Sequence, residues 1–117
     1  MLKVVGREVH ILFVCQLGEE RSKYMGAICN EIAKEYGLSR IAFVHSSPYK
    51  VRRFLKKTSY DLIMATDDVA EKVRKILEDI GVNTMFKVVD KKCIESKECV
   101  KNLIIESLVE LNIISKG

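Results

Sequence analysis

The sequence has no tryptophan, a single proline and no long hydrophobic run, and these shortages exclude several classes of protein. No apolar stretch approaches the roughly 20 residues that a helix needs to cross a bilayer, so no membrane association is expected. The segment 4–8 contains Arg7 and Glu8, whose charges interrupt the apolar stretch that a signal peptide requires. We therefore expect a cytoplasmic protein.

Proline and glycine are also too few for a linker-rich or low-complexity chain, and no internal repeat is visible. Hydrophobic residues make up 48% and charged residues 31% of the sequence, which is typical of a folded globular protein. A chain of 117 residues is long enough to bury a core. We expect one domain that spans residues 1–117.

Histidine is scarce, with two residues, and the spacing of the cysteines does not resemble that of a zinc site. The chain has four cysteines, at positions 15, 29, 93 and 99, without a C-x2-C pair. We expect no metal and no cofactor. In a cytoplasmic protein the cysteines should be reduced thiols, with Cys29 and Cys99 packed in helical core stripes. His10 and His45 lie in or beside predicted strands and are expected to be structural rather than catalytic.

The net charge of +4 is modest, and its densest basic stretch covers residues 50–57. Nucleic-acid binding requires such a stretch to be interleaved with aromatic side chains, and only Tyr49 and Phe54 offer this. A solvated helix face is the favoured interpretation. We expect no nucleic-acid partner, whereas a basic rim would attract an anionic substrate.

Apolar segments rich in β-branched residues alternate with segments of helical periodicity along the chain. The predicted strands are Val9–Val14, Ile41–His45, Asp61–Ala65 and Met85–Val89. The predicted helices cover residues 21–36, 49–57, 67–80 and 97–113. This alternation predicts a three-layer α/β domain, a four-stranded parallel sheet with helices on both faces. Right-handed crossovers give the strand order 2-1-3-4, so the order reverses at the carboxyl end of the first strand, where such sheets bind ligands.

Cys15 lies at this reversal point, and the residues after it suggest a phosphate-binding loop. A short loop leads from Cys15 into a predicted helix, and its backbone N–H groups and helix dipole favour an anion at one spot. The same field favours the thiolate form of Cys15. Gly18 permits a positive φ within the loop, Ser22 can hydrogen-bond the sulfur, and Arg21 can bind two phosphate oxygens at once.

The segment Ile11–Cys15 followed by Arg21 and Ser22 resembles the opening of the low-molecular-weight protein tyrosine phosphatases. Further along, residues 60–67 resemble the third-strand segment of that family, and Val88–Asp90 falls where the family has its general-acid loop. The resemblance implies a cysteine-dependent phosphate monoester hydrolase that acts through a phosphocysteine without a metal. Its substrate would be a phosphorylated protein or a small phosphate ester.

By this resemblance each site residue has an expected role. Cys15 attacks phosphorus, Arg21 binds the equatorial oxygens, and Asp90 protonates the leaving oxygen. The residues expected to bind the phosphoryl group are Gln16, Leu17, Gly18, Glu19, Glu20 and Ser22. The chain departs from the family after Asp90, where two lysines replace the proline and the substrate-gripping tyrosines.

Glu19 and Glu20 are unusual in a loop that should bind an anion. Two hypotheses follow from them. In the first, both carboxylates point into solvent, which screens their repulsion and leaves the site active. In the second, one of them pairs with Arg21 and withdraws it from the site, which leaves a catalytically weak phosphate-binding relative.

Enzyme IIB of the sugar phosphotransferase system is the main alternative. The pattern Cys15-x-x-Gly18-x-x-Arg21-Ser22 resembles its phosphocysteine loop, which often has threonine in place of the arginine. Such a protein carries a phosphoryl group between partners and avoids hydrolysing it. Two weaker alternatives are an arsenate reductase that uses Cys93 and Cys99, whose positions do not match that family, and a scaffold without catalysis. The oligomeric state is not predictable from the sequence.

Overall fold

The computed structural model describes residues 8–114, so most of the N-terminal segment 4–8 discussed above lies outside the described part. Four strands form one sheet: β1 (Val9–Val14), β2 (Ile41–Ser46), β3 (Leu62–Thr66) and β4 (Met85–Val89). The longer helices are α1 (Glu20–Glu35), α2 (Val51–Lys57), α3 (Ala70–Ile80) and α5 (Lys97–Glu110). Two short helices complete the described chain, a 3-10 turn η1 (Pro48–Lys50) and α4 (Lys91–Ile94).

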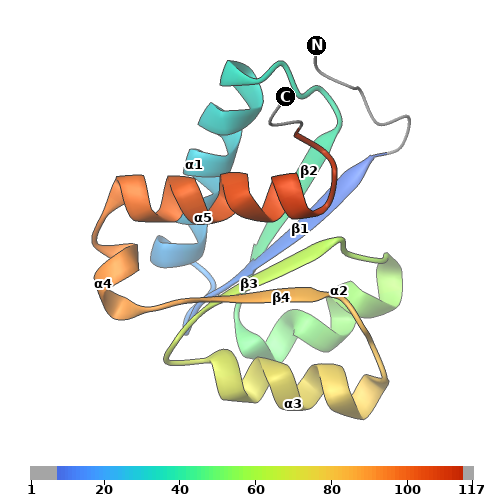
Figure 1. Cartoon of the computed structure of the whole chain (residues 1–117). Coiled ribbons are helices and arrows are strands. Elements are labelled where there is room, and N and C mark those ends of the chain that lie inside the picture. Colours follow the sequence, from blue (N-terminus) through green and yellow to red (C-terminus); the bar gives the residue numbers. More distant parts are fainter. Residues whose placement is uncertain (1–7, 115–117) are drawn as a thin grey trace.

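The sheet is fully parallel and has the strand order β2-β1-β3-β4, which confirms the predicted topology (Figure 1). In the register of β1 with its two neighbours, Val14 lies beside Ser46 of β2 and Ala65 of β3. The carboxyl ends of these three strands therefore meet at one edge of the sheet. Cys15 directly follows Val14 and lies at that edge, at the predicted reversal of strand order.

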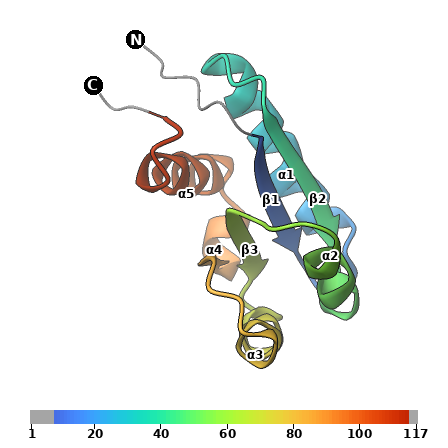
Figure 2. The same ribbon diagram turned by 90° about the vertical axis from the view of Figure 1, so that its right-hand side faces the viewer.

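Alternate side chains of the central strands pack into two separate cores, one on each face of the sheet. Ile11 and Phe13 of β1 pack with the core that α1 and α5 cover, whereas Leu12 and Val14 pack with the core under α2 and α3. Figure 2 shows α5 and α3 on opposite sides of β3. All four of these β1 side chains are completely buried, as expected for a central strand of a parallel sheet. The three-layer α/β prediction is therefore confirmed.

Helix boundaries differ from the sequence predictions at a few points. The predicted helix 49–57 is split into η1 and α2, and α3 begins at Ala70 rather than near residue 67. The short helix α4 was not predicted, because four residues are too few to show helical periodicity. Among the described residues, no helix has both the length and the apolar character needed to span a membrane.

The cysteine prediction was wrong for one pair. Cys93 and Cys99 form a disulfide that joins α4 to the first turn of α5, with their Cα atoms 5.2 Å apart. The sequence suggested a core position for Cys99, but its side chain is exposed and the disulfide, not the core, is its main contact. The reason is the unpredicted helix α4, after which the chain folds back so that the two cysteines meet. Cys29 is free and completely buried in the core beneath α1, as predicted.

Candidate active site

Cys15 lies between the end of β1 and the start of α1, in a loop that turns tightly around its sulfur atom. Its backbone N–H donates to the carbonyl oxygen of Ser46 at 3.1 Å, which extends the pairing of β1 with β2 by one residue. Gly18 N–H donates back to the Cys15 carbonyl oxygen at 3.3 Å, and Gly18 has the positive φ of 71° that the sequence predicted. The loop then enters α1 at Glu20, so the amino terminus of that helix faces the sulfur.

Ser22 makes the predicted contact with the sulfur of Cys15. The Cys15 Sγ and Ser22 Oγ atoms are 3.3 Å apart, and the Ser22 backbone N–H donates to Sγ at 3.4 Å. In the neutral state the thiol donates to Ser22 Oγ, and the hydroxyl donates to the carbonyl oxygen of Glu19 at 3.4 Å. When the sulfur ionises, the hydroxyl can turn and donate to the thiolate instead. Ser22 is completely buried, so this hydrogen bond does not compete with solvent.

These donors control the ionisation of Cys15. Burial is the largest single influence and by itself raises the pKa of the thiol, because it disfavours the charged form. Hydrogen bonds from the Ser22 hydroxyl and from the backbone N–H groups of Ser22, Gly18 and Glu19 act in the opposite direction. Together they exceed the effect of burial, and the pKa of Cys15 falls below its ordinary value. Burial without such donors raises the pKa of Cys29 to about 12.

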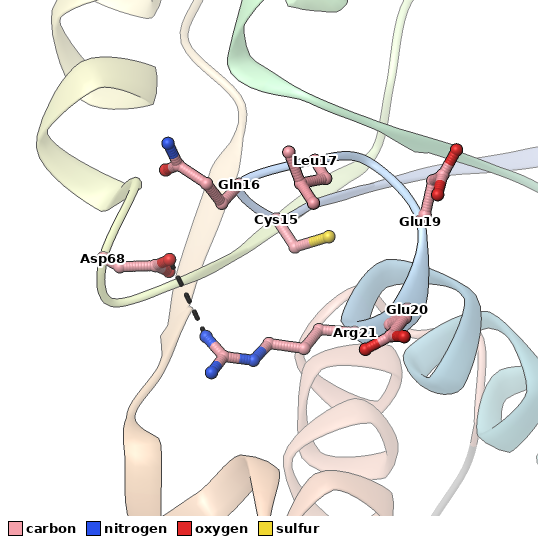
Figure 3. Close-up of a pocket in the computed structure, with 7 residues that line it drawn as sticks. All are labelled: Cys15, Gln16, Leu17, Glu19, Glu20, Arg21 and Asp68. Carbon is pink, nitrogen blue, oxygen red and sulfur yellow. Dashed lines mark ion pairs between the residues drawn. The ribbon is translucent and has the colours of Figure 1, made fainter.

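The sulfur of Cys15 faces an open hollow of about 320 Å³ (Figure 3). The hollow is lined by Cys15, Gln16, Leu17, Glu19, Glu20, Arg21 and Asp68. Every one of these residues except Asp68 was predicted from the sequence to belong to the site. The other two predicted binding residues do not line the hollow: Gly18 forms the turn of the loop, and Ser22 contacts the sulfur.

The carboxylates of the loop do not remove Arg21 from the site. Within residues 8–114, the ion pair of Arg21 is with Asp68, at 3.7 Å between Nη1 and Oδ2, and not with Glu19 or Glu20. Both glutamates are exposed, and Figure 3 shows Glu19 directed away from the sulfur of Cys15. Solvent therefore screens their repulsion of a bound anion, as the first of the two sequence hypotheses requires.

Asp68 is the site residue that sequence reasoning missed. It lies in the loop between β3 and α3, and its side chain reaches across the hollow to Arg21 (Figure 3). Its other carboxylate oxygen accepts a hydrogen bond from Thr66, the last residue of β3. The predicted topology could have identified Asp68. The carboxyl ends of neighbouring parallel strands lie at one edge of the sheet, so the residues after β3 lie beside Cys15.

Asp90 does not line this hollow in the structure. Its Oδ1 accepts a hydrogen bond from the backbone N–H of Cys93 at 2.7 Å, which makes Asp90 the N-cap of α4. An N-cap aspartate is a common structural device, and here it also fixes the start of the segment closed by the disulfide. The general-acid role expected for Asp90 therefore stays a prediction without a contact that supports it.

The strand order and the loop after β1 define an α/β domain with Cys15 at the carboxyl edge of its parallel sheet. No protein-family model matches the chain, and no curated protein matches it by sequence. A solved structure with the same fold is the lactose-specific IIB component domain of the phosphoenolpyruvate:carbohydrate phosphotransferase system from Streptococcus pneumoniae. The TM-score is 0.60 at 17% sequence identity, and the match covers 86% of this chain and 98% of the other.

Proposed function

We propose that the protein is a phosphocysteine carrier, which accepts a phosphoryl group on Cys15 and passes it to a partner. The observation that carries the proposal is the sulfur of Cys15, which faces an open hollow and receives hydrogen bonds from Ser22 and the loop amides. A thiolate in a ring of N–H donors is suited to attack phosphorus and to hold the phosphoryl oxygens afterwards.

The transfer consists of two in-line displacements. In the first, the Cys15 thiolate attacks phosphorus, a P–S bond forms, and the bond to the donor's leaving group breaks with its electron pair. In the second, a nucleophile of the acceptor attacks phosphorus, and the P–S electron pair returns to Cys15 as thiolate. Arg21 and the loop amides compensate the charge of the phosphoryl oxygens in both steps.

Two features favour a carrier over a hydrolase. The similar solved structure is a component of a phosphotransferase system, and the resemblance of the Cys15–Ser22 loop to enzyme IIB was already present in the sequence. In addition, Asp90 is engaged as a helix N-cap and does not line the hollow, so the proton donor of the phosphatase scheme is missing from its expected place. The phosphoryl donor and acceptor would be partner proteins or small phosphate esters, in the cytoplasm as the sequence predicted.

Phosphate monoester hydrolysis is the second candidate function. The presence of Arg21 and the position of Asp68 favour it. The carrier loop often has threonine where this chain has Arg21, whereas a phosphatase requires arginine there. Asp68 lines the same hollow and pairs with Arg21, so its carboxylate is placed to take a proton from an attacking water. In that reaction water would attack phosphorus, and the P–S bond would break to release inorganic phosphate and the thiolate.

The lifetime of the phosphorylated protein separates these two functions. The protein is phosphorylated with a small donor such as acetyl phosphate, freed of excess donor, and followed by intact-protein mass spectrometry. A carrier is expected to keep the phosphoryl group for hours in neutral buffer, and a hydrolase to lose it within seconds. The matched variants Asp68→Asn and Asp90→Asn are expected to change this lifetime by less than about threefold, because neither carboxylate activates water in a carrier.

The variants also identify the acid or base if the carrier proposal is wrong. A short wild-type lifetime that Asp68→Asn extends about 100-fold or more would establish hydrolysis with Asp68 as the base. The same extension by Asp90→Asn alone would establish hydrolysis with Asp90 as the base that activates water. Either result would overturn the carrier proposal.

A further inference from the structure

His45 contacts the cysteine loop from the neighbouring strand. It is the next-to-last residue of β2, its side chain is exposed, and its Nδ1 lies 2.8 Å from the carbonyl oxygen of Gly18. A carbonyl oxygen only accepts hydrogen bonds, so Nδ1 must carry the hydrogen. This is possible in the neutral ring and in the imidazolium ion. The hydrogen bond therefore exists in both protonation states of His45.

This hydrogen bond fixes the orientation of one peptide group in the loop. The peptide between Gly18 and Glu19 is planar and trans, so its C=O and its N–H point in opposite directions. Because the Gly18 carbonyl points toward His45 on β2, the Glu19 N–H points to the other side. On that side lies Cys15, and the Glu19 N–H is one of the backbone donors that lower the pKa of its thiol.

The backbone around this peptide packs closely against β2. The orientation of the peptide therefore depends on β2 as well as on the loop. A Cβ atom on Gly18 would lie 2.5 Å from the backbone nitrogen of Ser47 and 2.7 Å from the carbonyl carbon of Ser46. The loop also begins with the hydrogen bond from Cys15 N–H to Ser46. Where the loop packs against β2, His45 is the side-chain donor. Its hydrogen bond holds the peptide group between Gly18 and Glu19.

We propose that His45 is a positioning residue for the cysteine site: by binding the Gly18 carbonyl, it directs the Glu19 N–H onto the sulfur and onto the phosphoryl group. The inference rests on the proposed function only in that Cys15 must bind an oxyanion, and it holds for a carrier and for a hydrolase. The sequence predicted a structural role for His45. Its effect reaches the reacting atoms through a backbone amide, although the side chain touches neither the sulfur nor the hollow.

The test compares three histidine variants with the wild type. His45→Ala removes the donor, and His45→Asn restores one, because its Nδ2 takes nearly the place of the imidazole Nδ1. His10→Ala is the matched control, since His10 lies at the amino end of β1, the end opposite Cys15. Two quantities are measured for each protein: the dissociation constant for inorganic phosphate, by NMR titration, and the pKa of Cys15, from the pH dependence of its alkylation.

We expect His45→Ala to weaken phosphate binding about 3–10-fold, because part of one hydrogen bond to a charged group is lost. We also expect it to raise the pKa of Cys15. His45→Asn and His10→Ala should match the wild type within about twofold in phosphate affinity. If His45→Ala does not fold, His45→Leu, which keeps side-chain bulk without a donor, takes its place with the same expected results.

The inference is wrong if His45→Ala, or His45→Leu in its place, matches the wild type in both measurements. It is also wrong if His45→Asn behaves like the donor-free variant, because the bulk of the ring and not its hydrogen bond would then matter. A different result defeats the proposed function itself: wild-type protein that binds no phosphate and has a Cys15 thiol of ordinary pKa. The two failures are therefore distinguishable in one set of measurements.

Discussion

The variant Cys15→Ser should form no phosphoryl adduct with acetyl phosphate, because the proposed nucleophile is the ionised sulfur. A serine hydroxyl in the same loop stays protonated at neutral pH and is a much weaker nucleophile. Intact-protein mass spectrometry after incubation with the donor measures the effect. The expected result is a complete loss of the mass increase of one phosphoryl group.

The same variant should still bind inorganic phosphate, with an affinity at least equal to that of the wild type. The loop amides and Arg21 remain in place, and the repulsion between the thiolate and a phosphate dianion is removed. Cys29→Ala is the control for loss of a free thiol, since Cys29 is buried far from solvent in the core and should leave adduct formation unchanged. An adduct that persists in Cys15→Ser and disappears in Cys29→Ala would contradict the assignment.

The substitution Gly18→Ala should destabilise the protein and abolish phosphate binding. A Cβ atom at this position would lie 2.5 Å from the backbone nitrogen of Ser47, a contact that only a backbone shift can relieve. The φ of 71° adds the cost of a left-handed conformation in an L-residue. Together these effects are expected to lower the free energy of unfolding by about 2–5 kcal/mol. Urea denaturation measures the stability, and NMR titration measures phosphate binding.

Gly81→Ala is the matched control for this prediction. Gly81 ends α3 with a similar φ of 79°, but a Cβ atom there would meet no atom within 4 Å. Its substitution should therefore cost only the conformational part, about 1–2 kcal/mol, and leave phosphate binding intact. Equal losses of stability in the two variants would show that the close approach of Gly18 to β2 contributes nothing.

The fold and the position of Cys15 at the edge of the sheet were predictable from the sequence because both depend on local patterns. The buried strand Val9–Val14 is almost continuously apolar, and the alternation of strands and helices determines a parallel sheet with a known handedness of crossover. Cys15 follows that strand directly, and Gly18, Arg21 and Ser22 are its near neighbours in the chain. One short segment of sequence therefore contains most of the site.

The remaining features depend on contacts between distant segments or on very short elements. Asp68 reaches the hollow from the loop after β3, and His45 binds the loop from the end of β2, so no spacing near Cys15 reveals either one. The Cys93–Cys99 disulfide depends on α4, which is too short for a periodic signal. Asp90 follows β4 at the expected position, but the sequence does not reveal that its carboxylate caps α4.

The pH dependence of Cys15 alkylation tests the central claim most directly. Wild-type protein is treated with iodoacetamide from acid to alkaline pH, and the modified peptides are quantified by mass spectrometry. Because only the thiolate reacts, the rate at Cys15 should rise with pH and level off, with a midpoint below the ordinary thiol pKa of about 8.5. Cys29, whose pKa burial raises to about 12, should stay unmodified in the folded protein. A midpoint for Cys15 at or above the ordinary value would contradict the account, because the loop would then not favour the thiolate over the neutral thiol.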